Sequence, residues 1–268
     1  MISLRNVSFR YSEDDPWVLQ DISLEIPQGQ LSVIIGPNGS GKSTLAELIT
    51  GLLEPSSGNI LVGGLDTREH PPHMRGRVGL VFQNPEHQFF HTTVAEDVAF
   101  GPQNLGLSPE EVEERTERVL REVGLWDLAQ ENPMKLSWGQ KQLVAIAGIL
   151  AMEPACLILD EPTSMLDPPS KKAVRSLIRR FRDRTGCTVL WITQDMEELV
   201  GAQRVIVLNR GRIAFDGGWK ELLGLESLLQ GMGFQRPTAL ELVSFLEKRG
   251  LVEEAHLLLF RWEELLSW

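Results

Sequence analysis

A glycine-rich segment of the chain has residue types and a spacing suited to holding phosphate groups. Residues 36–43 match the pattern G-x-x-x-x-G-K-[ST], and they follow a short apolar run, residues 31–35. In such a loop successive backbone N–H groups converge on phosphate oxygens, and the next helix adds the positive end of its dipole. Lys42 would reach the β- and γ-phosphates of a nucleotide, and the Ser43 hydroxyl would bind Mg²⁺. A merely structural turn is the weaker explanation, because the sequence around the loop favours both the strand and the helix that phosphate binding requires.

Two carboxylates follow a second apolar run and suggest the chemistry that accompanies the phosphate loop. Residues 157–159 are apolar, and Asp160 and Glu161 come directly after them. Ligands of open α/β sheets bind at the carboxyl ends of the strands. Asp160 is suited to be a direct or water-mediated Mg²⁺ ligand, and Glu161 to be the general base that polarises an attacking water. Alone, the two acids are equally well explained as a solvated strand end, but the phosphate loop favours the catalytic interpretation.

The elements that must position these residues alternate between strands and helices. Residues 4–11 and 20–26 alternate in polarity, as antiparallel strands do. The apolar runs typical of buried parallel strands are residues 31–35, 78–82, 156–159 and 188–192. Helices are predicted over residues 43–53, 108–123, 143–150 and 171–184 and from about residue 219, and a hairpin around residues 209–211. Strands alternating with helices predict a mostly parallel sheet covered on both sides.

Composition limits the classes of function. The 268 residues carry a formal net charge of −11, which argues against a general role on nucleic acid. No segment approaches the ~18 uninterrupted apolar residues of a membrane span, and residues 1–5 lack the apolar core of a signal peptide. We therefore expect the chain to stay in the cytoplasm, with Cys156 and Cys187 as buried thiols rather than a disulfide or a metal site.

Five further segments make the chain resemble the ABC ATPases in the order and spacing of their motifs. Tyr11 resembles the aromatic that stacks on adenine, and Gln83 resembles the glutamine that senses Mg²⁺ and the attacking water. Residues 136–140 resemble the family signature, and residues 164–167 resemble the loop that crosses to the partner subunit. Residues 192–195 resemble a segment in which the family carries a histidine. For Tyr11 the alternative is a strand aromatic in the core. The resemblance covers about residues 1–220. It implies an α/β P-loop NTPase with an antiparallel β subdomain, an α-helical subdomain inserted at about residues 86–150, and a C-terminal helical extension over residues 221–268.

The resemblance also implies cofactors and a role for each site residue. ATP and Mg²⁺ are the expected cofactors, and the expected catalytic residues are Glu161, Lys42, Gln83 and Gln194. ATP binding is expected from Tyr11, Gly36, Asn38, Gly39, Ser40, Gly41, Lys42, Ser43 and Thr44, and Mg²⁺ binding from Ser43, Gln83 and Asp160. Two subunits of this family join head to tail, so the signature residues would contact ATP held by the partner, and Asp167 would lie in the loop that crosses to it. The signature residues are Ser137, Trp138, Gly139 and Gln140.

A narrower resemblance is to the ATPases of energy-coupling-factor transporters, which import vitamins and transition-metal ions such as cobalt or nickel. It rests on residues 83–89, 94–101, 140–148 and 236–251. It implies a second ABC ATPase subunit, a transmembrane coupling subunit and a substrate-binding membrane subunit as partners, at the cytoplasmic face of the membrane. Basic helix ends of the coupling subunit would dock near residues 83–101. There Glu96 and Asp97 would either accept hydrogen bonds from arginines at those helix ends or be ordinary acids of a helix N-terminus.

Two positions depart from the family pattern in a way that bears on activity. Gln194 replaces the histidine that contacts the γ-phosphate, and glutamine can donate a hydrogen bond but cannot titrate near neutral pH. Trp138 replaces the first signature glycine, which puts an indole where the backbone should approach phosphate. Leu143 also replaces an arginine common in this helix. We hypothesise a heterodimer with a second, related ATPase and two unequal sites, and neutral drift with full activity is the alternative.

Other interpretations of the function remain open from the sequence. A non-hydrolysing subunit that gates the complex is kept open by Gln194, whereas Lys42, Asp160 and Glu161 favour an ATPase. A soluble ABC protein of DNA repair or translation is not favoured, because that class would show a long coiled-coil insertion or a second ATPase cassette, and this sequence shows neither. The histidines His70, His73, His87 and His91 gather in a short span but are more typical of an exposed loop than of a metal site.

The end of the chain carries an apolar stripe within residues 251–268. It includes Leu258, Leu259, Trp262, Leu265 and Leu266, and it should pack on the parent domain or the partner ATPase. Insertion into a membrane is less favoured, because the acids of the same segment would repel anionic lipid. These acids are Glu253, Glu254, Glu263 and Glu264.

Overall fold

The computed structural model describes residues 1–69, 76–235 and 237–266, except for the side chains of Glu263 and Leu265. The expectations for His70, His73 and Leu265, and the family match at Arg236, therefore lie outside the described part. Within that part, no helix combines the length and the apolar character needed to cross a bilayer.

Two sheets form the framework of the molecule. The first is antiparallel, with the order β2-β1-β4-β5. It contains β1 (Ile2–Phe9), β2 (Leu19–Ile26), β4 (Ser57–Val62) and β5 (Leu65–Asp66). The second has the order β10-β9-β3-β8-β7-β6, and only its β9–β10 pair is antiparallel. It contains β3 (Leu31–Ile35), β6 (Val78–Val81), β7 (Cys156–Asp160), β8 (Thr188–Thr193), β9 (Arg204–Asn209) and β10 (Arg212–Gly217).

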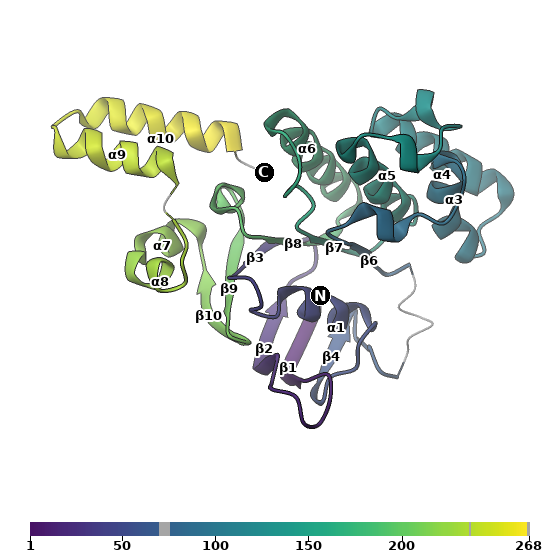
Figure 1. Ribbon diagram of the computed structural model, residues 1–268, viewed down its shortest axis with the longest axis horizontal. Coiled ribbons are helices and arrows are strands. Elements are labelled where there is room, and N and C mark those ends of the chain that lie inside the picture. The colour runs from purple at the N-terminus through teal and green to yellow at the C-terminus, as the bar shows by residue number, and fades with distance from the viewer. Residues whose placement is uncertain (70–75, 236, 267–268) are drawn as a thin grey trace.

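The second sheet is buried on both faces, which explains the continuous apolar runs of its strands. Alternate residues of each strand enter different cores, since side chains of a strand point to opposite faces. Val33, Leu157 and Trp191 belong to one core, and Ile34, Ile158 and Ile192 belong to the other. In Figure 1 this sheet separates α5 and α6 above it from α1 and the antiparallel sheet below it. Because β6, β7, β8, β3 and β9 run parallel, their carboxyl ends meet at the same edge of this sheet.

Helices cover both faces and build an inserted subdomain. The elements are α1 (Lys42–Thr50), the short helix η1 (Pro85–Gln88), α3 (Val94–Asn104), α4 (Pro109–Glu122), η2 (Trp126–Leu128), η3 (Pro133–Lys135), α5 (Trp138–Ala151), α6 (Pro168–Thr185) and η4 (Met196–Leu199). Capping boxes of Thr93 with Glu96, Ser108 with Glu111, and Ser137 with Gln140 fix where α3, α4 and α5 begin. The predicted start of a helix at Ser108 is therefore confirmed.

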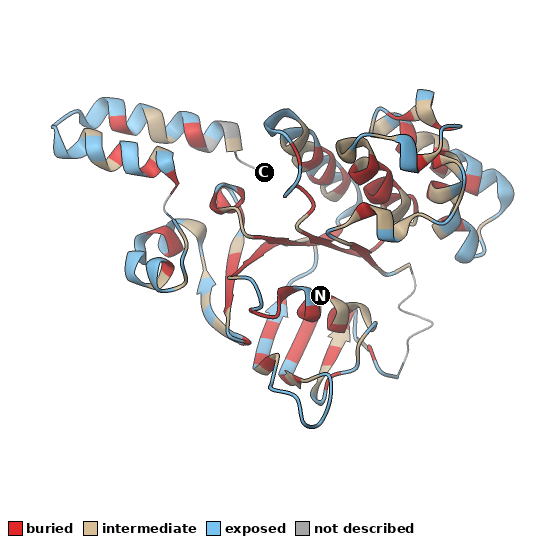
Figure 2. Cartoon of the chain, in the orientation of Figure 1, coloured by how far each residue is buried: buried red, intermediate tan, exposed pale blue. Residues whose placement is uncertain are grey.

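The chain continues beyond β10 as a series of helices. They are α7 (Trp219–Gly224), α8 (Glu226–Gly231), α9 (Thr238–Lys248) and α10 (Val252–Leu266). α9 and α10 form a hairpin that projects from the body and is mostly exposed (Figure 2). Trp262 is buried in the main core, Leu258, Leu259 and Leu266 are half-buried, and Arg175 of α6 donates to the carbonyl of Leu266 at 3.3 Å. Of the two partners expected for this stripe, the parent domain or the second ATPase, the parent domain covers Leu259, Trp262 and Leu266.

The sequence predicted most of the strands and helices, with ends that differ by a few residues. The antiparallel opening, the buried parallel strands and the final hairpin are all present, and both cysteines are buried free thiols. The strands β4 and β5 were missed, and α3 was anticipated only through the interpretation of Glu96 and Asp97 as acids of a helix N-terminus. Residues 57–62, with the sequence SGNILV, include a glycine and two polar residues, and this segment becomes a strand through pairing with β1. Such long-range pairing overrides weak local preference.

Candidate active site

The glycine-rich loop lies where β3 meets α1, at the carboxyl edge of the parallel strands. Two of its glycines are required, Gly36 by lack of space and Gly41 chiefly by its backbone conformation. A Cβ at Gly36 would lie 2.1 Å from the carbonyl oxygen of Leu208, and one at Gly41 would lie 2.6 Å from Leu19. Gly41 also has a φ of 101°, in the left-handed region, at the N-cap of α1. The backbone can therefore curve around a phosphate group only with glycine at these positions.

Lys42 is buried beneath this loop. Its ammonium group donates to the carbonyls of Gly36 at 2.8 Å and Pro37 at 3.0 Å. Burial lowers the pKa of Lys42, and the negative charges of Glu161 and Asp160 partly oppose that shift. A bound phosphate would supply the negative charge that a buried lysine lacks. The position agrees with the role in phosphate binding expected from the sequence.

Asp160 ends β7 beside the first turn of α1. Burial raises the pKa of its carboxyl, while a hydrogen bond from Ser43 lowers it and the charge of Glu161 raises it further. The carboxylate and the Ser43 hydroxyl are hard oxygen ligands in direct contact, which is the donor set that Mg²⁺ prefers. A divalent cation would also relieve the cost of burying the Asp160 charge. The two residues fit the expected Mg²⁺ site, and Gln83, the third expected ligand, lies on the neighbouring strand end.

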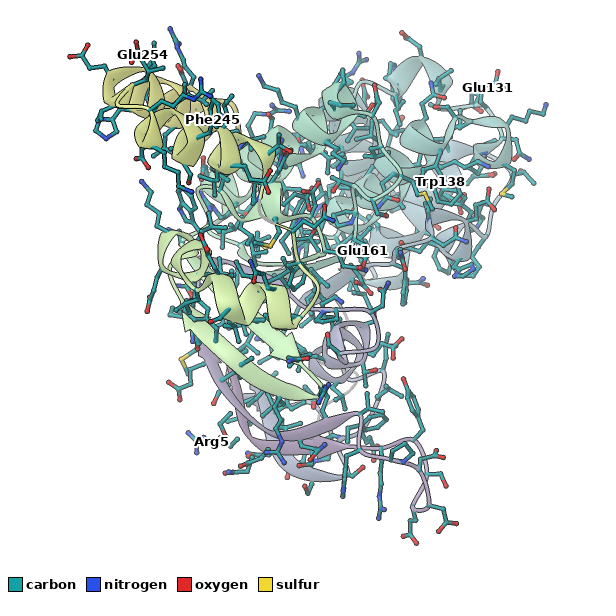
Figure 3. All side chains as sticks on the ribbon, turned by 60° about the vertical axis from the view of Figure 1, so that its left-hand side comes forward. Arg5, Glu131, Trp138, Glu161, Phe245 and Glu254 are labelled. Atoms are coloured by element: carbon teal, nitrogen blue, oxygen red, sulfur yellow. The ribbon has the colours of Figure 1, made fainter. Side chains whose placement is uncertain are left out.

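Glu161 is held by residues from two separate segments, and one of them also links it to the phosphate loop. Gln83, after β6, donates to Glu161 Oε2 at 2.9 Å, and Gln194, after β8, donates to Glu161 Oε1. Gln194 also donates to Asn38 Oδ1 of the phosphate loop at 2.7 Å. Glu161 itself has a φ of 48°, an unfavourable value for a residue with a Cβ, and its N–H donates to the carbonyl of Ile192 at 2.9 Å. The network holds the carboxylate at the sheet edge, near the centre of the molecule in Figure 3.

Tyr11 lies at the end of β1, outside the core. The residue is 63% exposed, and its ring meets Phe9 edge-on, with the two centroids 4.9 Å apart. Its hydroxyl shares a hydrogen bond of 3.2 Å with Thr44 Oγ1, at the start of α1. The alternative of a buried core aromatic is therefore wrong. The exposed ring beside the phosphate loop is in a position to stack on a base.

The signature residues lie at the start of α5. Ser137 Oγ accepts from the N–H of Gln140 at 3.4 Å, and the Gln140 amide accepts from the N–H of Ser137 at 3.0 Å. The Trp138 side chain is half-buried and packs against the main core. Figure 3 places Trp138 on the helical subdomain, above Glu161. Within the described part of the chain, no hydrogen bond joins these residues to the phosphate loop, so the structure does not bring the two motifs together.

Asp167 is the exposed N-cap residue of α6, and its side chain makes no capping hydrogen bond. The preceding residue, Leu166, is buried close to the signature, since a Cβ at Gly139 would lie 3.6 Å from it. The loop of residues 164–167 and the signature therefore share one face of the subunit. Ser164, at the start of this loop, donates from its hydroxyl to the backbone carbonyl of Glu161 at 3.1 Å, so the loop also borders the site.

Two contacts near the site escaped the sequence reasoning. Lys171 pairs with Asp195 at 2.8 Å, and the buried carboxylate of Glu198 is hydrogen-bonded by Thr163 and Trp191. Glu198 follows Gln194 by four residues and stands among the apolar residues 196, 199 and 200. A single acid in such a run is a pattern that could have identified it, because a buried charge needs partners.

The chain matches known proteins over most of its length. The family model described as ABC transporter matches residues 19–164, more than half of the chain. The protein named energy-coupling factor transporter ATP-binding protein EcfA1 of Caldanaerobacter subterraneus subsp. tengcongensis is 48% identical over 256 residues, which cover 94% of this chain and 92% of that protein. The protein named EcfA of Methanosarcina acetivorans is 46% identical over 253 residues, covering 94% and 91%.

Two solved structures have a similar fold. The structure of cbiO1 from Clostridium perfringens, described as part of the ABC transporter complex cbiONQ, has a TM-score of 0.78 and 33% identity, and covers 96% of this chain and 97% of that chain. The ATP-binding cassette MJ0796, described as a dimer in a post-hydrolysis state bound to ADP and Pi, has a TM-score of 0.74 and 28% identity, covering 82% and 99%.

Proposed function

This chain belongs to the ABC transporter family, and on that premise we propose that it is the ATP-hydrolysing motor subunit of an energy-coupling-factor importer. The importer would take up a vitamin or a transition-metal ion through membrane partner subunits, with this subunit at the cytoplasmic face. The names of the relatives support the transporter type. The chemistry of the site supports the ATPase activity.

The arrangement of Glu161 is the observation that carries the proposal. The phosphate loop and Lys42 would hold the β- and γ-phosphates, and Glu161 would accept the proton of the attacking water. Gln83 and Gln194 donate to its two carboxylate oxygens and so orient the base. Mg²⁺, held by Ser43 and Asp160, would neutralise charge on the phosphate oxygens. The link from Gln194 to Asn38 ties the base to the loop that would carry the γ-phosphate.

A second ATPase subunit would complete the site. Ser137, Trp138, Gly139 and Gln140 begin a helix whose N-terminal N–H groups are suited to an anion. Within the described residues of this subunit, no hydrogen bond joins them to the phosphate loop, and Asp167 is exposed. The head-to-tail pairing implied by the resemblance would bring the signature to ATP held by the other chain and Asp167 into contact with that chain.

The docking region for the coupling subunit is proposed near residues 83–101. A cavity of about 580 Å³ there is lined largely by apolar residues of α3, α5 and the segments that flank η1, among them Phe82, Phe90 and Phe100. Asp97 accepts from the N–H groups of Phe90 at 2.8 Å and His91 at 3.0 Å, and Glu96 belongs to the capping box of α3. These contacts favour the interpretation of both acids as ordinary helix N-terminal residues.

The test of the ATPase proposal is the variant Glu161→Gln. Removing the general base should lower kcat by about 10²-fold or more, whereas the affinity for a fluorescent ATP analogue should stay near that of the wild type. Turnover and affinity are measured on the chain together with a second related ATPase subunit and with excess Mg²⁺. If the turnover of Glu161→Gln equals that of the wild type, Glu161 is not the general base.

A gating subunit with little hydrolysis of its own is the second candidate, and Gln194 is the observation that favours it. In a heterodimer, Gln194 weakens the site on this chain's loop and Trp138 weakens the site on the partner's loop. We expect Gln194→His and Trp138→Gly to raise turnover in that assembly. Brisk turnover of this chain alone, unchanged by either substitution, would contradict the idea of unequal sites.

A further inference from the structure

A carboxylate that the proposed mechanism does not use is buried next to the site. Glu198, in η4, is 1% exposed. Its Oε1 accepts from the hydroxyl of Thr163, and its Oε2 accepts from the indole N–H of Trp191 at 2.8 Å. Trp191 is fully buried in the middle of β8. A buried carboxylate is costly unless it is hydrogen-bonded, so these two donors fix Glu198 in one position.

The hydrogen bond between Thr163 and Glu198 joins two loops that both touch the reacting centre. Thr163 follows Glu161 by two residues and comes directly before the crossing loop, residues 164–167. Glu198 follows Gln194 by four residues. The contact between Glu161 and Gln194 therefore depends on how these two loops lie relative to each other.

A second contact joins the same loops on the other side of Asp167. Lys171, in the first turn of α6, donates to Asp195 Oδ2 at 2.8 Å. Burial opposes the charge of Lys171, but the hydrogen bond and charge of Asp195 outweigh it and raise the lysine pKa. Thr163 stands four residues before Asp167, and Lys171 stands four residues after it. The crossing loop is thus attached at both ends to residues 195–198.

We propose that Glu198 is a positioning residue for ATP hydrolysis, which holds Thr163 so that Glu161 keeps its contact with Gln194 while Asp167 is presented to the partner subunit. The inference rests on the proposed ATPase function. Misplacement of a catalytic group by about 1 Å can cost ~10²-fold in rate, whereas the phosphate loop that binds ATP belongs to a different segment. Loss of the Thr163–Glu198 contact should therefore lower kcat and leave ATP binding nearly unchanged.

The test compares three variants with a matched control. Thr163→Val removes the hydroxyl at nearly constant shape, Thr163→Ser keeps it, and Glu198→Gln removes the charge. Thr188→Val is the control, because Thr188 is also buried and its hydroxyl accepts from the N–H of Gly29 at 3.0 Å, at the opposite end of β8. Steady-state ATP hydrolysis and binding of a fluorescent ATP analogue are measured on the chain with its partner ATPase, after melting curves establish folding.

We expect Thr163→Val and Glu198→Gln to lower kcat by about 10- to 100-fold, with KM changed by less than about threefold. Thr163→Ser should recover most of the rate, and Thr188→Val should lower the melting temperature without lowering kcat. Equal kcat in Thr163→Val and Thr188→Val, or a loss seen only in KM, would overturn the positioning role. Absence of turnover in the wild type would instead count against the ATPase proposal itself. In that case, hydrogen exchange of residues 194–200 still tests the contact, since Thr163→Val should accelerate it and Thr188→Val should not.

Discussion

Asp160 and Lys42 are buried beside the phosphate loop, and burial opposes the charge of each residue. The subunit thus carries an electrostatic cost at the position where ATP and Mg²⁺ would bind. Ligand charges would relieve that cost, because a cation compensates the Asp160 carboxylate and a phosphate compensates the Lys42 ammonium. Much of the free energy of binding ATP and Mg²⁺ would therefore come from Lys42 and Asp160, whose charges are poorly stabilised in the ligand-free protein.

The substitution Asp160→Asn tests this description at the scale of one residue. The asparagine side chain would keep an acceptor for the Ser43 hydroxyl but carry no charge, so the melting temperature of the nucleotide-free protein should rise. The extra stabilisation by ATP and Mg²⁺ should shrink, because the cation loses a charged ligand. Differential scanning calorimetry with and without MgATP measures both effects. A lower melting temperature for nucleotide-free Asp160→Asn would contradict the proposed electrostatic cost.

The sequence predicted which residues belong to the site better than it predicted their contacts. Lys42, Asp160 and Glu161 could be assigned because their motifs specify both residue type and the element that carries it. The link from Gln194 to Asn38 spans 156 positions of the chain, and Glu198 pairs with Thr163 across 35 positions. Such contacts depend on the order of strands in the sheet, which no local pattern contains.

At the scale of elements, the start of α3 depends on one buried carboxylate. The Asp97 side chain is 4% exposed and accepts from the N–H groups of Phe90 and His91 and, at 3.3 Å, from the ring of His91. These residues precede the helix, so Asp97 shapes the entry of the chain into the helical subdomain. The sequence indicated this helix only through the acids at its N-terminus, because Pro102 lies within the helix and its apolar stripe is short.

We expect Asp97→Ala to destabilise the protein by about 1–3 kcal/mol, the usual cost of leaving buried donors without an acceptor. Urea unfolding, followed by circular dichroism, measures the change. Glu96→Ala is the matched control, because Glu96 is an exposed member of the adjacent capping box. Equal destabilisation by the two substitutions would mean that Asp97 has no special structural role.

At the scale of the whole molecule, the projecting hairpin of α9 and α10 leaves apolar side chains uncovered. Leu257 and Phe260 are 61% and 63% exposed, on the same helix whose Trp262 packs into the main core. The parent domain therefore covers only one side of the stripe expected from the sequence. We infer that the second ATPase subunit covers the other side.

The double variant Leu257→Glu, Phe260→Glu tests this inference. Burial of a large apolar side chain contributes about 1.5–3 kcal/mol, so its loss should raise the dissociation constant of the ATPase pair by at least ~10-fold. The melting temperature of the single subunit should stay nearly constant. Analytical ultracentrifugation measures the association, with Leu52→Glu as control, since Leu52 is also 61% exposed but lies beyond the end of α1. Equal association of the double variant and the control would exclude the hairpin from the interface.

The central claim is that the phosphate loop and Glu161 of this chain form half of an ATP site, which the signature of another chain completes. The most direct measurement is the ATP hydrolysis rate of this chain, diluted until it is monomeric, as a second chain is added. The added chain is either a copy carrying Lys42→Ala or the second related ATPase subunit with the equivalent substitution, so that it contributes only its signature. We predict negligible turnover at the start and a rise to saturation with at least one of the two. Full turnover by the monomer, unchanged by both additions, would contradict the claim.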